Sequence, residues 1–126
     1  MNPEILLALE NIVGSAYIFT DEATRKTYGH DETEDLSFPP HVVVKPANNE
    51  EVAQILRVSN TYKIPTTPIG ARTGLSGGAL SIYGGIGISM ERFNQIIEID
   101  EQNLQVTTQP GVITQVLREA VAEKGL

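Results

Sequence analysis

The sequence predicts an α/β chain, in the wider sense α+β, in which a βαβ unit with parallel strands is followed by a hairpin. Three observations predict this fold. Residues 41–45 are rich in valine without apolar–polar alternation, which is typical of a strand buried on both faces. Residues 48–59 carry apolar residues at helical spacing, and residues 64–69 form a second β-rich run. Strand, helix and strand within about 30 residues indicate parallel strands.

The first part of the chain, residues 1–38, reads as a lead-in to the main domain of residues 39–126. Apolar residues recur at helical spacing from Pro3 to Val13, and Gly14 is expected to end that helix. Residues 15–40 are polar and acidic. We therefore expect the lead-in to pack across the main domain rather than to form a domain of its own.

The helix after the first strand carries a start signal. Asn48 can cap its first turn, and Glu51 follows three residues later in a variant of the capping box. A glycine-bearing strand is expected over residues 85–90, beyond the second strand and a glycine-rich stretch.

The last third of the chain predicts a hairpin and a helix. Residues 96–100 and 104–109 are the two arms of the hairpin, joined by a turn of polar residues. Residues 113–121 form an amphipathic pattern, and Gly125 is expected to cap the end of that helix.

The composition excludes several classes of function. The 126 residues are about one domain, and a net charge of −7 argues against nucleic acid as the main partner. No apolar run approaches the roughly 20 residues of a membrane span. With no cysteine, disulfides, thiol catalysis and cysteine metal sites are excluded, and we expect a cytoplasmic protein. The two histidines, His30 and His41, lack further ligands at metal-binding spacing, so no metal site is predicted.

The most informative stretch is residues 68–79, which read PIGARTGLSGGA. Seven of the 11 glycines lie between Gly70 and Gly87, directly after the second predicted strand. Glycine lets another group approach the main chain, and a loop of this kind can turn several backbone N–H groups toward a phosphate. The spacing fits neither a P-loop nor the Gly-x-Gly-x-x-Gly fingerprint. On glycine content alone, a crossover that needs tight turns remains an alternative.

The charge distribution around this stretch is uneven. Residues 52–90 contain no Asp or Glu, while Arg57, Lys63 and Arg72 fall inside the span. Excluding carboxylates would avoid repulsion of a bound phosphate. Chance in an apolar segment explains the same pattern about equally well.

The motif at residues 68–79 resembles the pyrophosphate loop of the FAD-binding domain in the vanillyl-alcohol oxidase and p-cresol methylhydroxylase (PCMH-type) family. Within it, the branch of the glycolate oxidase catalytic subunit and FAD-linked D-lactate dehydrogenase is the most similar. The resemblance covers residues 25–126. It is carried also by Tyr28 with Asp31, Val42-Val43-Val44 between Pro40 and Pro46, Glu50-Glu51-Val52, Met90 to Asn94, Ile96 to Asp100, and Gln109-Pro110-Gly111-Val112.

This resemblance implies the N-terminal subdomain of a PCMH-type domain, with the FAD pyrophosphate on the loop amides. It implies oxidation of a 2-hydroxy acid, of the glycolate or D-lactate type, to the 2-oxo acid, with electrons passed to a further acceptor. Some relatives attach FAD through a histidine or cysteine in this loop, and this loop has neither, so non-covalent FAD is expected. The expected cofactor-binding residues are Pro68, Gly70, Ala71, Arg72, Thr73, Gly74, Leu75, Ser76, Gly77 and Gly78, with Gly111 and Val112 on the adenosine side.

Two departures from the family pattern qualify this hypothesis. Arg72 stands where glycine is common, so its side chain either reaches a phosphate or points to the rim and solvent. The family's domain continues beyond Leu126 with a second subdomain and a substrate cap. We therefore expect a truncated chain that holds half of the cofactor site, has no catalytic residue and is inactive alone. The alternatives are a non-catalytic nucleotide-binding module and a subunit that completes its fold against a partner chain or in an oligomer.

Overall fold

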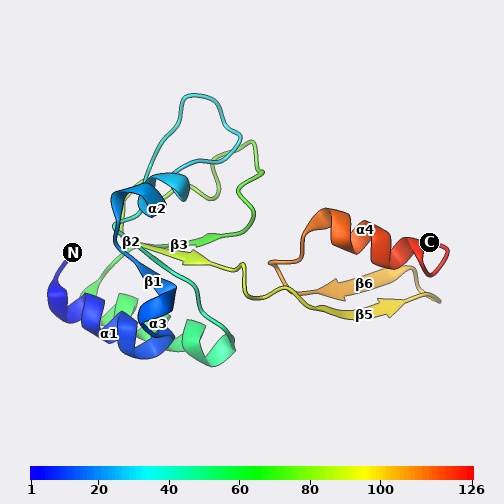
Figure 1. The fold of residues 1–126 in the computed structure, drawn as a ribbon, viewed down its shortest axis with the longest axis horizontal. Helices are drawn as coiled ribbons and strands as arrows, with labels where there is room; N and C mark the ends of the chain where they lie inside the picture. The colour runs from blue at the N-terminus through cyan, green and yellow to red at the C-terminus, as the bar shows by residue number, and fades with distance from the viewer.

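The computed structural model describes residues 1–126 as a four-stranded sheet with helices on both faces and a projecting arm (Figure 1). In the figure, the arm is the C-terminal part of the chain, from residue 96 onward (yellow to red), and it extends away from the sheet. The elements in chain order are α1 (Pro3–Val13), a 3₁₀ turn η1 (Ser15–Tyr17), β1 (Ile18–Phe19), α2 (Glu22–Thr27), β2 (Val42–Val44), α3 (Asn49–Tyr62), β3 (Thr66–Ile69), β4 (Ile86–Ser89), β5 (Ile96–Asp100), β6 (Gln105–Thr108) and α4 (Thr114–Ala122).

The sheet has the strand order β1-β2-β4-β3. β4 runs parallel to both β2 and β3, with Gly87 opposite Val43 on one side and Thr67 on the other. The predicted parallel arrangement of the βαβ strands is confirmed, but β4 lies between them. All four residues of β4 are buried, which suits a central strand. Pro68 in β3 has no N–H to donate, which suits an edge strand.

The main core lies between the sheet and the helices α1 and α3. β2 contributes to both faces of the sheet, because Val42, Val43 and Val44 are all fully buried, as the absence of alternation predicted. Val43 packs on the opposite face with Tyr28 and Ile69. The larger cluster consists of Ile5, Leu9, Val13, Val42, Val44, Ile55, Ile86 and Ile88.

The helix boundaries follow their capping residues. Gly14, at φ +88°, ends α1 as expected and donates its N–H to the carbonyl of Glu10. At the start of α3, the Asn48 side chain accepts from the N–H of Glu51 at 2.9 Å. The Glu51 carboxylate in turn accepts from the N–H of Ala47 at 3.3 Å, which makes it a variant capping box. α3 continues to Tyr62, three residues beyond the predicted pattern.

Two short elements were not predicted. β1 has two residues and pairs antiparallel with β2, so the lead-in contributes the edge of the main sheet. α2 has six residues and begins where the Asp21 side chain accepts from the N–H of Thr24. Neither segment is long enough to display a period, so the pattern of residues 15–40 gave no signal for them.

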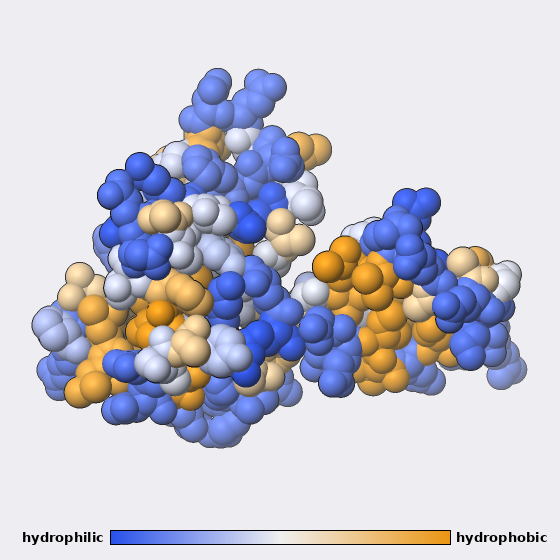
Figure 2. All heavy atoms as spheres, viewed as in Figure 1, coloured by the Kyte–Doolittle hydropathy of each residue, from blue (hydrophilic) through white to orange (hydrophobic).

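The arm is largely uncovered. β5 and β6 pair antiparallel as predicted, and no residue of α4 is buried. Gly125 has φ +77°, and Leu126 donates to the carbonyl of Val121, so Gly125 turns the chain after α4. Figure 2 shows an apolar patch on the arm. The exposed apolar residues of the arm are Ile97, Leu104, Val106, Ile113, Val116 and Leu126. No helix of the chain has the length and apolar character needed to cross a bilayer.

Candidate functional site

The glycine loop, defined here as residues 70–78, leaves the C-terminal end of β3 beside the end of β4. Met90, directly after β4, donates its N–H to the carbonyl of Ile69 at 2.9 Å and holds the two ends together. This is the edge of a parallel sheet at which ligands of α/β proteins bind. The sequence-predicted loop therefore stands at the expected edge.

The backbone of the glycine loop has an unusual number of free donors. The N–H groups of residues 70–76 and of Gly78 donate to no other group of the chain. Most residues of the loop are exposed, so the loop is accessible to a ligand. A run of accessible backbone N–H groups is the chemistry that binds a phosphate.

Three glycines of the loop have no reason within the chain to be glycine. A Cβ atom at Gly70, Gly74 or Gly78 would meet nothing within 4 Å, and none of the three has positive φ. Gly77 differs, because its φ of +75° is strained for other residues. Open space above three glycines is what a closely approaching ligand requires.

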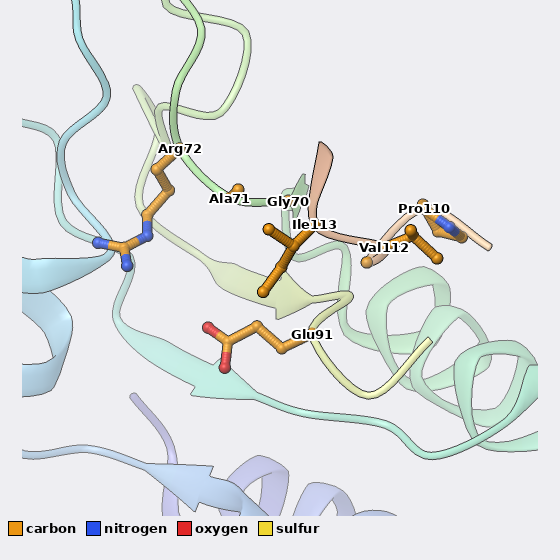
Figure 3. Close-up of a pocket in the computed structure, with 8 residues that line it drawn as sticks. Gly70, Ala71, Arg72, Glu91, Pro110, Val112 and Ile113 are labelled. Carbon is orange, nitrogen blue, oxygen red and sulfur yellow. The ribbon is translucent and has the colours of Figure 1, made fainter. Parts of the chain in front are cut away.

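A cavity of about 350 Å³ adjoins the start of the glycine loop (Figure 3). It lies between the loop and the turn that precedes α4. Within that turn, Gly111 donates its N–H to the carbonyl of Phe93 at 2.7 Å. The residues that line the cavity are Gly70, Ala71, Arg72, Glu91, Pro110, Gly111, Val112 and Ile113.

The Arg72 side chain extends from the cavity lining back onto the lead-in. Its guanidinium donates from Nη1 to the carbonyl of Thr27 at 2.6 Å and lies 4.6 Å from the centre of the Tyr28 ring. Its Nε is buried without a hydrogen-bond partner. Figure 3 shows it extending away from Pro110 and Val112. The guanidinium is thus held by contacts within the chain.

Glu91 brings a carboxylate to the cavity. It accepts hydrogen bonds from the Tyr28 hydroxyl and, at 3.2 Å, from Lys45 Nζ. Burial acts to raise the pKa of Glu91, but hydrogen bonds from Tyr28 and then Lys45 outweigh it, so the pKa lies below its ordinary value. Glu91 is therefore ionised at neutral pH, with its charge compensated by Lys45.

Asp31 brings a second carboxylate to the glycine loop. Its Oδ2 accepts from the N–H of Gly77 at 3.1 Å, and its Oδ1 accepts from the N–H of Thr33 at 2.8 Å. Hydrogen bonding by Thr33, and then by the Gly77 N–H, holds the pKa of Asp31 below its usual range. The absence of carboxylates from residues 52–90 thus does not leave the site free of them, because folding supplies them from outside that span.

The structure brings together only part of the predicted set. Gly70, Ala71, Arg72, Gly111 and Val112 line one cavity, whereas Pro68 lies within β3. Sequence reasoning missed Glu91, Pro110 and Ile113 as lining residues. Glu91 had a signal, because it ends the acid-free span. The remaining predicted residues lie farther along the loop and outside the cavity lining: Thr73, Gly74, Leu75, Ser76, Gly77 and Gly78.

A sequence profile of the family described as "FAD binding domain" matches residues 40–126 of this chain. The chain belongs to this FAD-binding family. FAD is accordingly its cofactor, as the glycine loop indicated. The unpaired N–H groups and the open space above Gly70, Gly74 and Gly78 fit the pyrophosphate of that cofactor.

Several relatives carry substrate names, including the following two. The glycolate oxidase subunit GlcD of Bacillus subtilis is 40% identical over 104 residues, which cover 82% of this chain and 22% of that protein. The D-lactate dehydrogenase of Anaerostipes hadrus is 37% identical over 127 residues, which cover 100% of this chain and 26% of that protein. This chain thus spans about a quarter of the length of the curated relatives it matches.

The fold is that of PCMH-type flavoenzymes. A crystal structure of p-cresol methylhydroxylase with substrate bound superimposes with a TM-score of 0.83 at 21% identity. The superposition covers 98% of this chain and 25% of that one. The predicted fold class, a βαβ unit with parallel strands plus a hairpin as in a PCMH-type domain, is confirmed.

Proposed function

We propose that this chain is the pyrophosphate-binding part of an FAD-dependent oxidoreductase that oxidises a 2-hydroxy acid, of the glycolate or D-lactate type, to the 2-oxo acid. The observation that carries the cofactor role is the run of unpaired N–H groups over residues 70–76 and Gly78. The names of the two relatives support the substrate class. The electron acceptor and any partner subunit belong to the intact protein, and the GlcD relative is itself named a subunit.

The residues of this chain would bind and orient the cofactor. The unpaired N–H groups of residues 70–76 and of Gly78 would meet the pyrophosphate, and Gly111 and Val112 the adenosine side, with Pro68 shaping the entrance. When bound, FAD would supply a flavin that accepts the hydride of the hydroxy acid. No residue of this chain is proposed as catalytic. Because the loop contains neither histidine nor cysteine, the flavin is held without a covalent bond.

The cofactor role is tested by titration of the intact, flavin-free protein. FAD and ADP should both bind, whereas AMP, which lacks the pyrophosphate, should bind at least about tenfold more weakly. Acid precipitation of the loaded protein should release the flavin into the supernatant. Absence of binding by both FAD and ADP would contradict the cofactor role, and flavin retained in the pellet would contradict non-covalent attachment.

The substrate class is tested separately, by bleaching of the flavin absorbance under anaerobic conditions. Glycolate or D-lactate should reduce the flavin, with L-lactate as the stereochemical control and p-cresol as the phenolic control. Reduction by p-cresol alone would place the substrate in another class. FAD binding without reduction by any of these compounds would favour the non-catalytic nucleotide-binding module.

A subunit completed by a partner chain is the remaining alternative, and one observation favours it. The arm exposes Ile97, Leu104 and Val106 along one hairpin, with Val116 on α4 and Leu126 at the end of the chain. Such apolar surface is usually covered in a stable protein. Light scattering of the intact protein should then give a dimer or larger species, and a monomer at high concentration would count against this alternative.

A further inference from the structure

Residues 27–33, here called the clamp, touch the glycine loop at three points along its length. Arg72 donates to the Thr27 carbonyl at 2.6 Å, and the N–H of Glu32 donates to the Gly74 carbonyl at 3.0 Å. The third contact joins the N–H of Gly77 to Asp31 Oδ2. These contacts come from a segment more than 40 positions away in sequence, so they are tertiary anchors rather than turns within the loop.

Two of the three contacts are themselves held in place. The Asp31 carboxylate is oriented by the N–H of Thr33, which donates to its other oxygen. The Arg72 guanidinium lies on the face of Tyr28, whose ring is buried against Val43 and Ile69 in the sheet. The clamp therefore connects the loop to the core. Its contacts use the Arg72 side chain, the Gly74 carbonyl and the Gly77 N–H, and they leave the unpaired N–H donors free.

The conformation of Arg72 indicates that its contact has a structural purpose. Its φ of +59° lies in the left-handed region, which costs a residue other than glycine on the order of 1 kcal/mol. An arginine persists there because its guanidinium reaches Thr27 and Tyr28. A cation used to bind a phosphate would instead point toward the place where the N–H groups of residues 73–76 would meet that phosphate.

We propose that the clamp fixes the shape of the glycine loop before the cofactor binds, and that Asp31 and Arg72 are positioning residues rather than phosphate ligands. Asp31 occupies the N–H of Gly77 as an internal anion, which removes that donor from the set available to FAD. Arg72 holds the start of the loop, and the donors between these two anchors remain free. The inference rests on the proposed binding of FAD by this loop.

Hydrogen exchange on the flavin-free intact protein tests the clamp without any cofactor. The reporters are the amides of Glu32 and Gly77, both hydrogen-bonded across the clamp. Asp31→Ala should speed their exchange at least about tenfold, whereas Glu34→Ala, a neighbouring carboxylate with no hydrogen bond in the chain, should leave it unchanged. Equal exchange in Asp31→Ala and the wild-type protein would overturn the role of Asp31.

Arg72 is tested with two variants that separate its contact from its strain. Arg72→Gly removes the contact and relieves the strained φ, while Arg72→Lys keeps the positive charge but not the planar guanidinium. If Arg72 is a positioning residue, the amides of Glu32 and Gly77 should exchange faster in both variants, and FAD binding should weaken about tenfold. Weakened FAD binding with unchanged exchange would instead make Arg72 a direct ligand and overturn the proposal.

The same set of proteins separates this proposal from the proposed function. Wild-type protein that fails to bind FAD contradicts the cofactor role, and the exchange rates still decide whether the clamp orders the loop. Wild-type protein that binds FAD, with exchange unaffected in the Asp31 and Arg72 variants, contradicts the clamp alone. Where Asp31→Ala fails to fold, Asp31→Asn, which keeps a single acceptor oxygen, should give an intermediate exchange rate, and a wild-type rate would overturn the proposal.

Discussion

Gly111 packs so tightly against Met90 that a Cβ atom at Gly111 would lie 2.2 Å from the Met90 carbonyl oxygen. The same atom would lie 2.7 Å from the carbonyl oxygen of Phe93. Both neighbours are backbone and cannot move aside without displacing the segment after β4. Gly111 thus joins the arm to the sheet beside the cavity, whatever its contact with the cofactor.

Gly111→Ala should therefore destabilise the protein by about 1–3 kcal/mol, the usual cost of forcing an extra methyl group into packed structure. The measurement is the midpoint of urea unfolding, compared with the wild-type protein. An unchanged midpoint would mean that the turn before α4 can shift to make room for the methyl group. The close packing of Gly111 against Met90 would then not contribute to stability.

Gly74→Ala should behave in the opposite way. Nothing lies within 4 Å of the added methyl group, and φ is not positive, so the stability should change by less than about 0.5 kcal/mol. The methyl group would occupy space that the ligand needs, and FAD binding should weaken about tenfold or more. Normal affinity in this variant would indicate that the pyrophosphate lies elsewhere on the loop.

The lowered pKa of Glu91 predicts a dependence of stability on acid. A carboxyl group with a lower pKa in the folded protein stabilises it fully above its ordinary pKa of about 4.5, and the contribution is lost as the pH falls through the folded value. Glu91→Gln removes this titration. Between pH 5 and pH 3, roughly the range in which carboxyl groups titrate, the wild-type protein should lose more stability than Glu91→Gln. The measurement is the free energy of unfolding of both proteins against pH, and parallel curves would refute the prediction.

Asn48→Ala should cost about 1 kcal/mol, because the side chain caps the first turn of α3. Asn49→Ala is the matched control, since Asn49 is also exposed and its side chain makes no hydrogen bond. Thermal unfolding of the two variants measures the difference. Equal melting temperatures would show that Asn48 is not a significant cap.

The sequence predicted the parts of the fold that carry a local signal. Valine runs, helical spacing and the Asn48 cap indicated the strands and helices correctly, and the glycine content located the loop. The position of β4 between β2 and β3 was not predicted, because strand order depends on contacts between distant segments. The strand's complete burial is visible only once the sheet is assembled.

The site shows the same division. The phosphate-binding character of residues 68–79 could be predicted, since glycine, hydroxyl and arginine residues lie close together there in the sequence. The roles of Asp31 and Glu91 were not readable, because each acts across more than 40 positions of sequence. Asp31 stands in the polar, acidic stretch of residues 15–40, where nothing local indicates its hydrogen bond to the loop.

The residues between β3 and β4 form one long connection, from position 70 to position 85, between two neighbouring parallel strands. The entropic free-energy cost of closing such a connection rises slowly with its length, by only about 0.6 kcal/mol for each doubling. Insertions in the exposed part of this connection would consequently leave the sheet folded. The scaffold can therefore vary its ligand-facing loop over evolutionary time, or in a directed library, while the register of β2, β4 and β3 stays constant.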